Sequence, residues 1–488
     1  MDTSNIGRAA ALMEKEIKDK NRLMFLLKNS RNIIRKIRKR TMGQKYIKHL
    51  SIPTRIYVSE NKLSVGYPKS QSVGLFQQSM RLTLMIGQVF TLLPVNGVFS
   101  RNNKKVTFTW RSWKCLYILI SLLGQMFITI MCIYRVFNTK TNLNGKTPVI
   151  FYGSTCITMV LFLRIARRWP TLVYHISRTE DHDYDYDSRL IYKCNVTCAV
   201  ILGLSILEHI LSLQSSLADI LTCSPDIGYE RFIKYIYPWI FNFIPYSPVL
   251  GGFIEVLHLQ STFVWNFSDL FVICMSYYLT SRLESVNRKL LAAKGKFLPE
   301  SFWRTAREDF ARVVQLIREV DDVINGIIFV CFANNLFFIC LQLFNTLDGG
   351  ITDIPTCDGE SPSNVKRSTV LLGGYESAVY FVFSLLYLLV RSIAMSVIVS
   401  YVHSASMVPA IVLYDVPSPV YCVEVQRFLD QVNGEKIALT GLKFFSVTRG
   451  LLLKVAGTIV TYELVMLQFN SSTIHAEKPT FLPSTDNN

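Results

Sequence analysis

Polar and ionisable side chains recur along one hydrophobic segment, residues 252–279. They are spaced three or four positions apart, so a helix would carry them in a single stripe. Ionisable groups are costly inside a membrane, where they pair with one another or contact a ligand. We therefore expect the stripe to hold neighbouring helices together or to form part of a binding pocket. It consists of Glu255, His258, Thr262, Trp265, Asn266 and Asp269.

Three other hydrophobic segments carry polar side chains at a similar depth. They are Glu208, His209 and Ser212 in one segment, Asn334, Asn335 and Gln342 in a second, and Glu376 and Tyr380 in a third. Asn266 and Asp269 lie deepest, so we assign these two residues to pairing between helices. The shallower residues that we assign to ligand contact are Glu208, His209, Glu255 and His258.

The composition is typical of a chain that crosses a membrane several times. Half of the 488 residues are apolar and 18% are charged, which excludes an ordinary soluble protein. About 20 apolar residues in a helix cross the hydrocarbon core of a bilayer. We predict an all-α fold with seven transmembrane helices. Their segments are 115–134, 149–165, 194–213, 252–279, 323–344, 375–401 and 450–469.

Lysine and arginine are distributed unequally between the two ends of these segments. Residues 1–50 and the loops at 164–193, 282–318 and 427–449 carry 33 of them, and the opposite side carries eight. The side that is richer in these residues faces the cytosol. We therefore expect a cytosolic N-terminus and an extracellular C-terminus, an orientation opposite to that of a G-protein-coupled receptor.

The predicted membrane domain, residues 115–470, is preceded by two regions of different character. Residues 1–70 form a basic arm, which suits either contact with anionic membrane lipid or a solvated tail. A basic flank of a multi-span protein lies on the cytosolic side, so we expect no nucleic-acid partner. Residues 71–114 begin with a moderately apolar stretch, which predicts an amphipathic helix at the inner membrane surface. Residues 471–488 would form a short extracellular tail.

The sequence lacks the spacings that catalysis or metal binding requires. Its eleven cysteines include no CxxC pair, and no cysteine–histidine cluster has metal-ligand spacing. No glycine-rich phosphate loop, paired carboxylates or nucleophile motif stands out. We expect neither enzyme activity nor a cofactor or metal.

The last hydrophobic segment, residues 450–469, is not uniformly apolar. Thr458, Thr461, Val465 and Gln468 share one helical face, which suits contact with water or bonds to neighbouring helices. Thr461-Tyr462, five residues and then Gln468-Phe469 resemble the C-terminal signature of insect gustatory receptors. Glu463 stands where that signature usually has an apolar residue, and this variant resembles the sugar-receptor branch. The preceding GLKFFSVTRGLLL and the stretch before the first span are similar to that branch as well.

This resemblance implies a ligand-gated, non-selective cation channel of the plasma membrane. Members of the family assemble as four subunits around a central pore, so we expect a homotetramer or a heterotetramer with other gustatory receptors. The last span would line the pore, with Gln468 and Phe469 at its constriction. The pore residues implied are Thr461, Val465, Gln468 and Phe469.

The same resemblance implies a sugar ligand bound in the extracellular half of each subunit. A sugar presents hydroxyl groups around its rim and C–H bonds on its faces. Its pocket therefore needs carboxylates and amides for hydrogen bonds and an aromatic plane to cover one face. The residues predicted to bind the ligand are Glu208, His209, Glu255, His258, Thr262, Trp265, Gln342, Glu376 and Tyr380.

Two cysteines, Cys223 and Cys357, lie in loops predicted to be extracellular. A disulfide persists outside the cell, so these two residues make one possible pair, although both could equally be free. Two other classes of protein remain as alternatives: an odorant-receptor-type channel and a metabotropic seven-span receptor. A transporter is disfavoured because the two halves of the sequence show no internal repeat.

Overall fold

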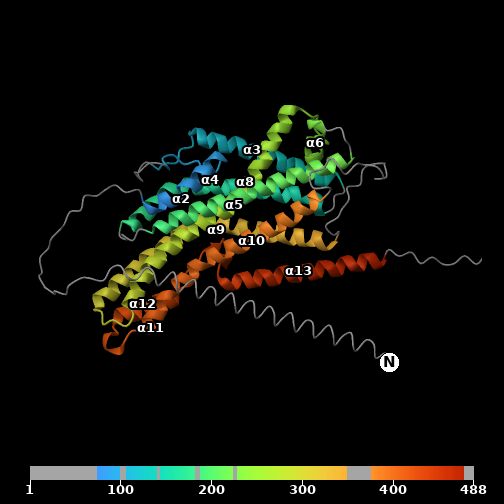
Figure 1. Cartoon of the computed structure of the whole chain (residues 1–488). Coiled ribbons are helices and arrows are strands. Elements are labelled where there is room, and N and C mark those ends of the chain that lie inside the picture. The colour runs from blue at the N-terminus through green and yellow to red at the C-terminus, as the bar shows by residue number, and fades with distance from the viewer. Residues whose placement is uncertain are drawn as a thin grey trace, which may run out of the picture. The chain divides into compact units, whose positions relative to one another are not determined.

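The computed structural model describes residues 74–98, 106–139, 143–181, 187–223, 228–348 and 375–476. They belong to one of the two units into which the chain divides, Gln71–Asn488. The predicted arm, residues 1–70, lies outside the described residues, as does Cys357. The described chain is almost entirely helical (Figure 1), which confirms the predicted all-α fold class.

Eight helices of 15 residues or more form the body of this described region. They are α2 (Leu75–Val89), α3 (Trp113–Asn138), α4 (Leu143–Glu180), α5 (Ser188–Cys223), α8 (Pro248–Ala293), α9 (Glu300–Asp348), α10 (Glu376–Ser406) and α13 (Arg449–Ala476). The shorter elements are α6 (Tyr229–Ile236), α7 (Pro238–Phe241), α11 (Val408–Tyr414), η3 (Ser418–Val420), α12 (Val423–Gly434), β1 (Thr440–Gly441) and β2 (Phe445–Ser446).

Within the described residues, five helices are long and apolar enough to cross a membrane. They are α3, α4, α5, α9 and the helix that begins with α10. Each includes a segment that we predicted as a span. The other two predicted spans lie in α8, which carries more polar side chains, and in α13, part of whose side chains lie outside the described residues. Their crossing, and with it the count of seven, stays a prediction.

Helix α8 lies at the centre of the bundle and packs against α4, α5, α9 and α10 (Figure 1). From Gln260 to Leu283 nearly every side chain is buried. The buried polar side chains of this stretch have partners on neighbouring helices: Asn266 accepts from Tyr387, and Asp269 pairs with Arg391. Aromatic rings form much of this packing, and the rings of Phe263 and Phe267 stack with centroids 5.4 Å apart.

The long helices continue well beyond the predicted spans, so the predicted loop 282–318 is mostly helical. Leu283 and Leu290 extend the buried face of α8, and Trp303 and Phe310 begin that of α9. These apolar residues keep helical spacing on a segment that is too charged for a span. For this reason the segment is helical although we predicted a loop. A short turn at Gly295, with φ of +75°, connects the two helices.

Helix α2 is amphipathic, as we expected of the stretch that precedes the first span. Phe76, Met80 and Leu84 are buried in the bundle, and Met85 and Val89 are exposed. The carboxylate of Glu180 accepts a hydrogen bond of 2.8 Å from the Phe76 backbone N–H, at the start of the helix. Negative groups stabilise a helix N-terminus, so Glu180 helps to fix α2 against α4.

Helix α13 is held at its start by a small hairpin of β1 and β2. Asp321 of α9 accepts hydrogen bonds from the backbone N–H and the hydroxyl of Thr440, at 2.6 and 2.7 Å. The Leu442 N–H donates to the Asn325 carbonyl at 3.2 Å. A side chain at Gly441 would collide with the ring of Phe445, so the hairpin needs glycine there. The base of α13 is thereby fixed to α9.

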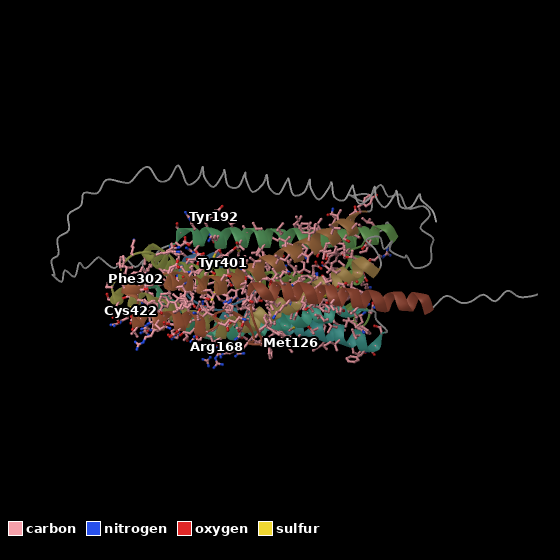
Figure 2. The ribbon with its side chains drawn as sticks, turned by 90° about the horizontal axis from the view of Figure 1, so that it is seen from below. Met126, Arg168, Tyr192, Phe302, Tyr401 and Cys422 are labelled. Carbon is pink, nitrogen blue, oxygen red and sulfur yellow. The ribbon has the colours of Figure 1, made fainter. Side chains whose placement is uncertain are left out.

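The elements α11 and α12 pack against one end of the long helices, where α8 and α9 are joined. Figure 1 shows α6 at the opposite end of the bundle. Figure 2 shows Phe302 and Cys422 together at the α11–α12 end, where both pack against the main apolar core. By the charge distribution, this end is the cytosolic one in our prediction.

Candidate ligand-binding site

Five side chains meet near the start of α8, four from the helices α4, α5 and α8 and one from the residue between α6 and α7. We call them the outer cluster: Tyr152, His209, Tyr237, Glu255 and His258. The Tyr237 hydroxyl donates a hydrogen bond to Glu255. The Tyr152 hydroxyl lies 2.9 Å from Nδ1 of His258. The rings of His209 and His258 have centroids 5.8 Å apart. Three predicted ligand-binding residues are thus brought into one group.

The outer cluster is positioned by the apolar packing around it. Tyr237 lies between α6 and α7, immediately before Pro238, whose fixed φ suits the first position of α7. The buried side chains of Ile233, Ile240 and Ile254 pack around the tyrosines in one apolar cluster. We did not predict Tyr152 and Tyr237, although a tyrosine in an apolar segment needs a partner for its hydroxyl.

One buried hydrogen-bond donor beside the outer cluster has no partner among the described residues. It is the indole N–H of Trp239, whose ring centroid lies 5.7 Å from that of Tyr237. Buried donors without a partner are rare, because each costs about 1–3 kcal/mol. Trp239 therefore marks a place where a polar ligand would gain a hydrogen bond.

A second group of predicted residues lies between α5, α9 and α10. The Ser384 hydroxyl donates to Glu208 at 2.6 Å and accepts from the Gln342 amide at 3.1 Å. Tyr380 has Ser212 and Ser384 as its hydrogen-bonding neighbours. The Gln342 carbonyl oxygen is buried and has no partner in the described part of the chain. This group thus holds both bonded and unbonded polar atoms.

Glu376 and Thr262 occupy different surroundings from these groups. Glu376 is buried at the start of α10 and interacts electrostatically with Asp219. Ser377 beside it donates to Asp219 at 3.0 Å. Thr262 donates to the His258 carbonyl of its own helix at 3.3 Å. Glu376 thus faces Asp219 of α5, and the hydroxyl of Thr262 bonds within its own helix.

A charged network lies deeper in the bundle and is centred on Arg391 of α10. Nε of Arg391 is 3.0 Å from Oδ2 of Asp269, and the two side chains are 2% and 0% exposed. The same guanidinium donates to the Asn266 carbonyl oxygen, which also accepts from Tyr387 at 2.8 Å. The expected pairing of Asn266 and Asp269 between helices agrees with this network.

Trp265 belongs to this deep network and not to the outer cluster. Its indole N–H donates to Asn335 at 3.3 Å, and Arg391 lies 4.7 Å from its ring centroid. The ring of Phe338 covers another side, at 4.7 Å between centroids. Our sequence reasoning omitted Arg391, although a lone arginine in an apolar run needs a partner in the bundle.

Comparison with known proteins places this arrangement in a family. The family described as trehalose receptor matches residues 30–352 and 364–478. The chain belongs to the trehalose receptor family. As a member, it is a multi-pass protein of the plasma membrane in the sugar branch of the insect gustatory receptors, and that family is not one of enzymes.

Two Drosophila melanogaster relatives cover most of this receptor. The gustatory receptor for sugar taste 64f is 33% identical over 405 residues, 82% of each chain. Gustatory receptor 5a for trehalose is 30% identical over 463 residues, 92% of this chain and 98% of the relative. The olfactory receptor OR5 of Machilis hrabei, solved with eugenol, shares the fold. It is 14% identical with a TM-score of 0.56 over 81% of this chain and 99% of its own.

The predicted pore residues of the receptor lie on α13. Thr461 and Val465 are exposed in the single subunit, on the face of α13 away from α9 and α10. Gln468 and Phe469 belong to the helix, but their side chains lie outside the described residues. The side chain of Cys223 lies outside them too, so the pairing with Cys357 stays a prediction.

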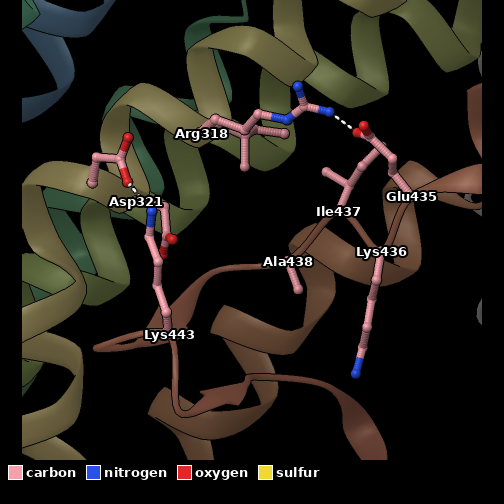
Figure 3. A pocket seen from close by; sticks show the side chains of 9 residues that line it. Arg318, Asp321, Glu435, Lys436, Ile437, Ala438 and Lys443 are labelled. Atoms are coloured by element: carbon pink, nitrogen blue, oxygen red, sulfur yellow. Dashed lines mark ion pairs between the residues drawn. The ribbon is translucent and has the colours of Figure 1, made fainter.

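A cavity of about 180 Å³ lies at the opposite end of the receptor, beside the base of α13 (Figure 3). Arg318 forms an ion pair with Glu435 across it, and Lys443 pairs with Asp322 at 2.6 Å. The positive and negative charges that line it compensate one another. This cavity therefore offers no net charge to a ligand, and we assign it to the attachment of α13.

Proposed function

We propose that this receptor binds a sugar of the trehalose class at the outer cluster and that binding opens a cation-conducting pore. The relatives named for sugar taste and for trehalose support the ligand class. The main observation that supports this binding site is the indole N–H of Trp239, which is buried beside the outer cluster without a partner among the described residues. A sugar hydroxyl would supply the missing acceptor.

The outer cluster has the mixture of groups that a sugar requires. Glu255 provides a carboxylate acceptor, His258 and Tyr237 provide groups that donate or accept, and Trp239 adds an aromatic face. The polar group around Glu208 and Gln342 extends the site toward α10. Predicted residues deeper in the bundle, Trp265 among them, would support the site from below.

In this proposal, α13 of four subunits surrounds the pore, and Thr461, Val465, Gln468 and Phe469 line it. Sugar binding draws the four copies of α13 apart. Phe469 serves as an apolar barrier, because a hydrophobic constriction stops ions by excluding water. Within the described chain α13 packs on α9 and α10, which leaves its other faces free for neighbouring subunits.

Current recordings from cells that express the receptor test the site. We expect Trp239→Phe, Glu255→Gln and His258→Ala to raise the trehalose concentration for half-maximal current. Leaving a buried partner unpaired costs about 1–3 kcal/mol, which corresponds to roughly 5- to 150-fold in affinity. The matched control is Glu230→Gln, because Glu230 is an exposed acid that pairs only with Lys234 four residues away in the described part.

Surface labelling measures whether each variant reaches the plasma membrane. Unchanged concentration–response curves in all three variants would place the sugar elsewhere. Activation of the unaltered receptor by apolar odorants and not by any sugar would favour the odorant-receptor-type channel instead. Currents that require a G protein would favour the metabotropic alternative.

A further inference from the structure

Three arginines lie on one side of α4, where the predicted second span ends. Arg164, Arg167 and Arg168 are all exposed within the described chain and lie within about one helical turn of one another. Figure 2 shows Arg168 at the outer edge of the bundle. Ile157 and Val160 precede them at three- and four-residue steps, and their side chains are 56% and 51% exposed. We call these five residues the outer face of α4, which is apolar along the predicted span and basic at its end.

The basic end of this face meets α9 and the hairpin before α13. Nη1 of Arg168 donates a hydrogen bond of 3.3 Å to the backbone carbonyl of Asp322. Asp322 immediately precedes the predicted fifth span, and its carboxylate pairs with Lys443 of the hairpin at 2.6 Å. The arginines therefore lie at the same end of the predicted spans as Lys443, which adds a fourth positive charge.

The positive charge of this end is not offset by acids in the part of the chain that the structure describes. Arg164 and Arg167 have no ion pair there, and Arg168 bonds a backbone carbonyl. The acids that approach α4 from α9 are Glu319 and Asp322, and both already pair with other groups. An arginine keeps its charge at any physiological pH, so this end of α4 attracts an anion.

A phospholipid with a negative headgroup has the chemistry that this face requires. The planar guanidinium group of arginine binds phosphate oxygens in a two-pronged contact, and basic clusters at the cytosolic membrane surface bind anionic headgroups. The acyl chains of the same molecule cover exposed apolar side chains such as Ile157 and Val160. A choline headgroup, in contrast, brings a positive charge toward four others.

We propose that the outer face of α4 binds an anionic phospholipid of the membrane leaflet at this end. Its phosphate lies against Arg164, Arg167 and Arg168, and one acyl chain lies along Ile157 and Val160. By the distribution of lysine and arginine this is the cytosolic leaflet, which contains the anionic lipids. The proposal is independent of sugar binding and of the opening of a pore.

Native mass spectrometry of the purified full-length receptor in detergent measures the binding of single lipids. We expect phosphatidylinositol to bind the unaltered receptor more tightly than phosphatidylcholine with the same acyl chains. The double variant Arg164→Gln, Arg167→Gln should weaken the binding of phosphatidylinositol about thirtyfold, or about fivefold for each arginine lost. Its binding of phosphatidylcholine should not change.

The matched control removes the same charge from another face at the same end of the predicted spans. Arg189 and Lys193 of α5 are exposed, and Figure 2 shows their neighbour Tyr192 at the edge of the bundle opposite Arg168. The double variant Arg189→Gln, Lys193→Gln should bind phosphatidylinositol as tightly as the unaltered receptor does. Equal weakening in the two double variants, or equal affinity of the unaltered receptor for the two lipids, would overturn the proposal.

Chemical modification tests the same face without any substitution. Phenylglyoxal reacts with accessible arginines, and mass spectrometry of the digested receptor locates the modified residues. Phosphatidylinositol should slow the modification of Arg164 and Arg167 several-fold in the delipidated receptor and leave that of Arg189 unchanged. Unchanged rates at all three arginines would contradict the proposal.

The same modification experiment also identifies a different occupant of this face. If Arg164 and Arg167 do not react even in the delipidated receptor, protein covers them, as a neighbouring subunit would, and the lipid proposal is wrong. Neither measurement requires a sugar or a current, so a failure of the proposed function leaves both tests intact.

Discussion

Arg391 carries a positive charge into the interior of the helix bundle, where only an opposite charge and hydrogen bonds make it tolerable. Asp269 supplies the charge, and Asn266 supplies an oxygen. Removal of one member of a buried ion pair leaves the other without compensation, which is more costly than loss of the pair itself. Arg391 is thus a residue on which the stability of α8 against α10 depends.

We predict that Arg391→Met lowers the free energy of unfolding by about 3–5 kcal/mol, because Asp269 is left buried and unpaired. Thermal denaturation of the receptor in detergent measures the change. The double variant Arg391→Met, Asp269→Leu should recover much of the loss, because it removes both charges. A double variant as unstable as the single one would show that the charge is not the cause.

The residues of this network show what sequence reasoning could predict at this scale. Helical spacing and depth were sufficient to assign Asn266 and Asp269 to pairing. They did not identify Arg391, because a spacing within one segment says nothing about which helix lies opposite. Tyr237 and Trp239 were not predicted for the same reason. They lie between predicted spans, and only the folded structure brings them to the site.

At the scale of the element, α12 is attached to α9 by a charged contact outside the membrane segments. Glu424 accepts hydrogen bonds from Arg307 of α9 at 2.8 Å and from Arg427 at 3.0 Å. The hydrogen bond from Arg307, followed by the charges of the two arginines, lowers the pKa of Glu424 below its ordinary value of 4.5. The ionised form of Glu424 is therefore favoured by folding.

Because the folded pKa is lowered, the stability that Glu424 contributes is present above pH 4.5 and is lost as the pH falls through the lowered folded value. We predict that Glu424→Gln flattens the decrease of melting temperature with acid over this window. The control is Glu300→Gln, since Glu300 forms an exposed pair with Arg304 within one helix. Equal acid sensitivity in Glu424→Gln and the unaltered receptor would contradict this role.

Helix α13 presents different faces to the bundle and to its surroundings. We predict that Thr461→Cys and Val465→Cys react with a charged, water-soluble thiol reagent applied with sugar, because their face borders the proposed pore. Ile459→Cys is the matched control, since Ile459 packs against α9 and α10. Modification is followed as a change in current relative to the unaltered receptor, whose own eleven cysteines set the baseline. Faster modification of Ile459→Cys would reverse the assignment of faces.

The elements also show where sequence reasoning ends. Hydrophobic runs in the sequence located the long apolar helices and the amphipathic helix α2, because burial follows apolar spacing closely. The lengths of α8 and α9 were underestimated, because their charged continuations are helical through packing of Leu290 and Phe310. The hairpin before α13 was not predicted, since its two-residue strands leave hardly any pattern in the sequence.

At the scale of the whole molecule, the predicted orientation in the membrane would separate this receptor from metabotropic ones. The distribution of lysine and arginine predicts that the C-terminus is outside the cell. An antibody to a C-terminal tag should therefore stain intact cells, and an antibody to an N-terminal tag should stain only permeabilised cells. Staining of the N-terminal tag alone on intact cells would show that the orientation is the reverse of the predicted one. The outer cluster would then lie on the cytosolic side.

The attachment of α13 at one end has a mechanical consequence for the assembled receptor. Its 28 residues extend about 42 Å from the hairpin, so a tilt about Thr440 and Leu442 would displace its far end most. A tilt of about 5° there would move the far end by about 4 Å, more than the diameter of a water molecule. Substitutions that loosen the contact of Asp321 with Thr440 would thus be amplified along the helix, far from the residues that are changed.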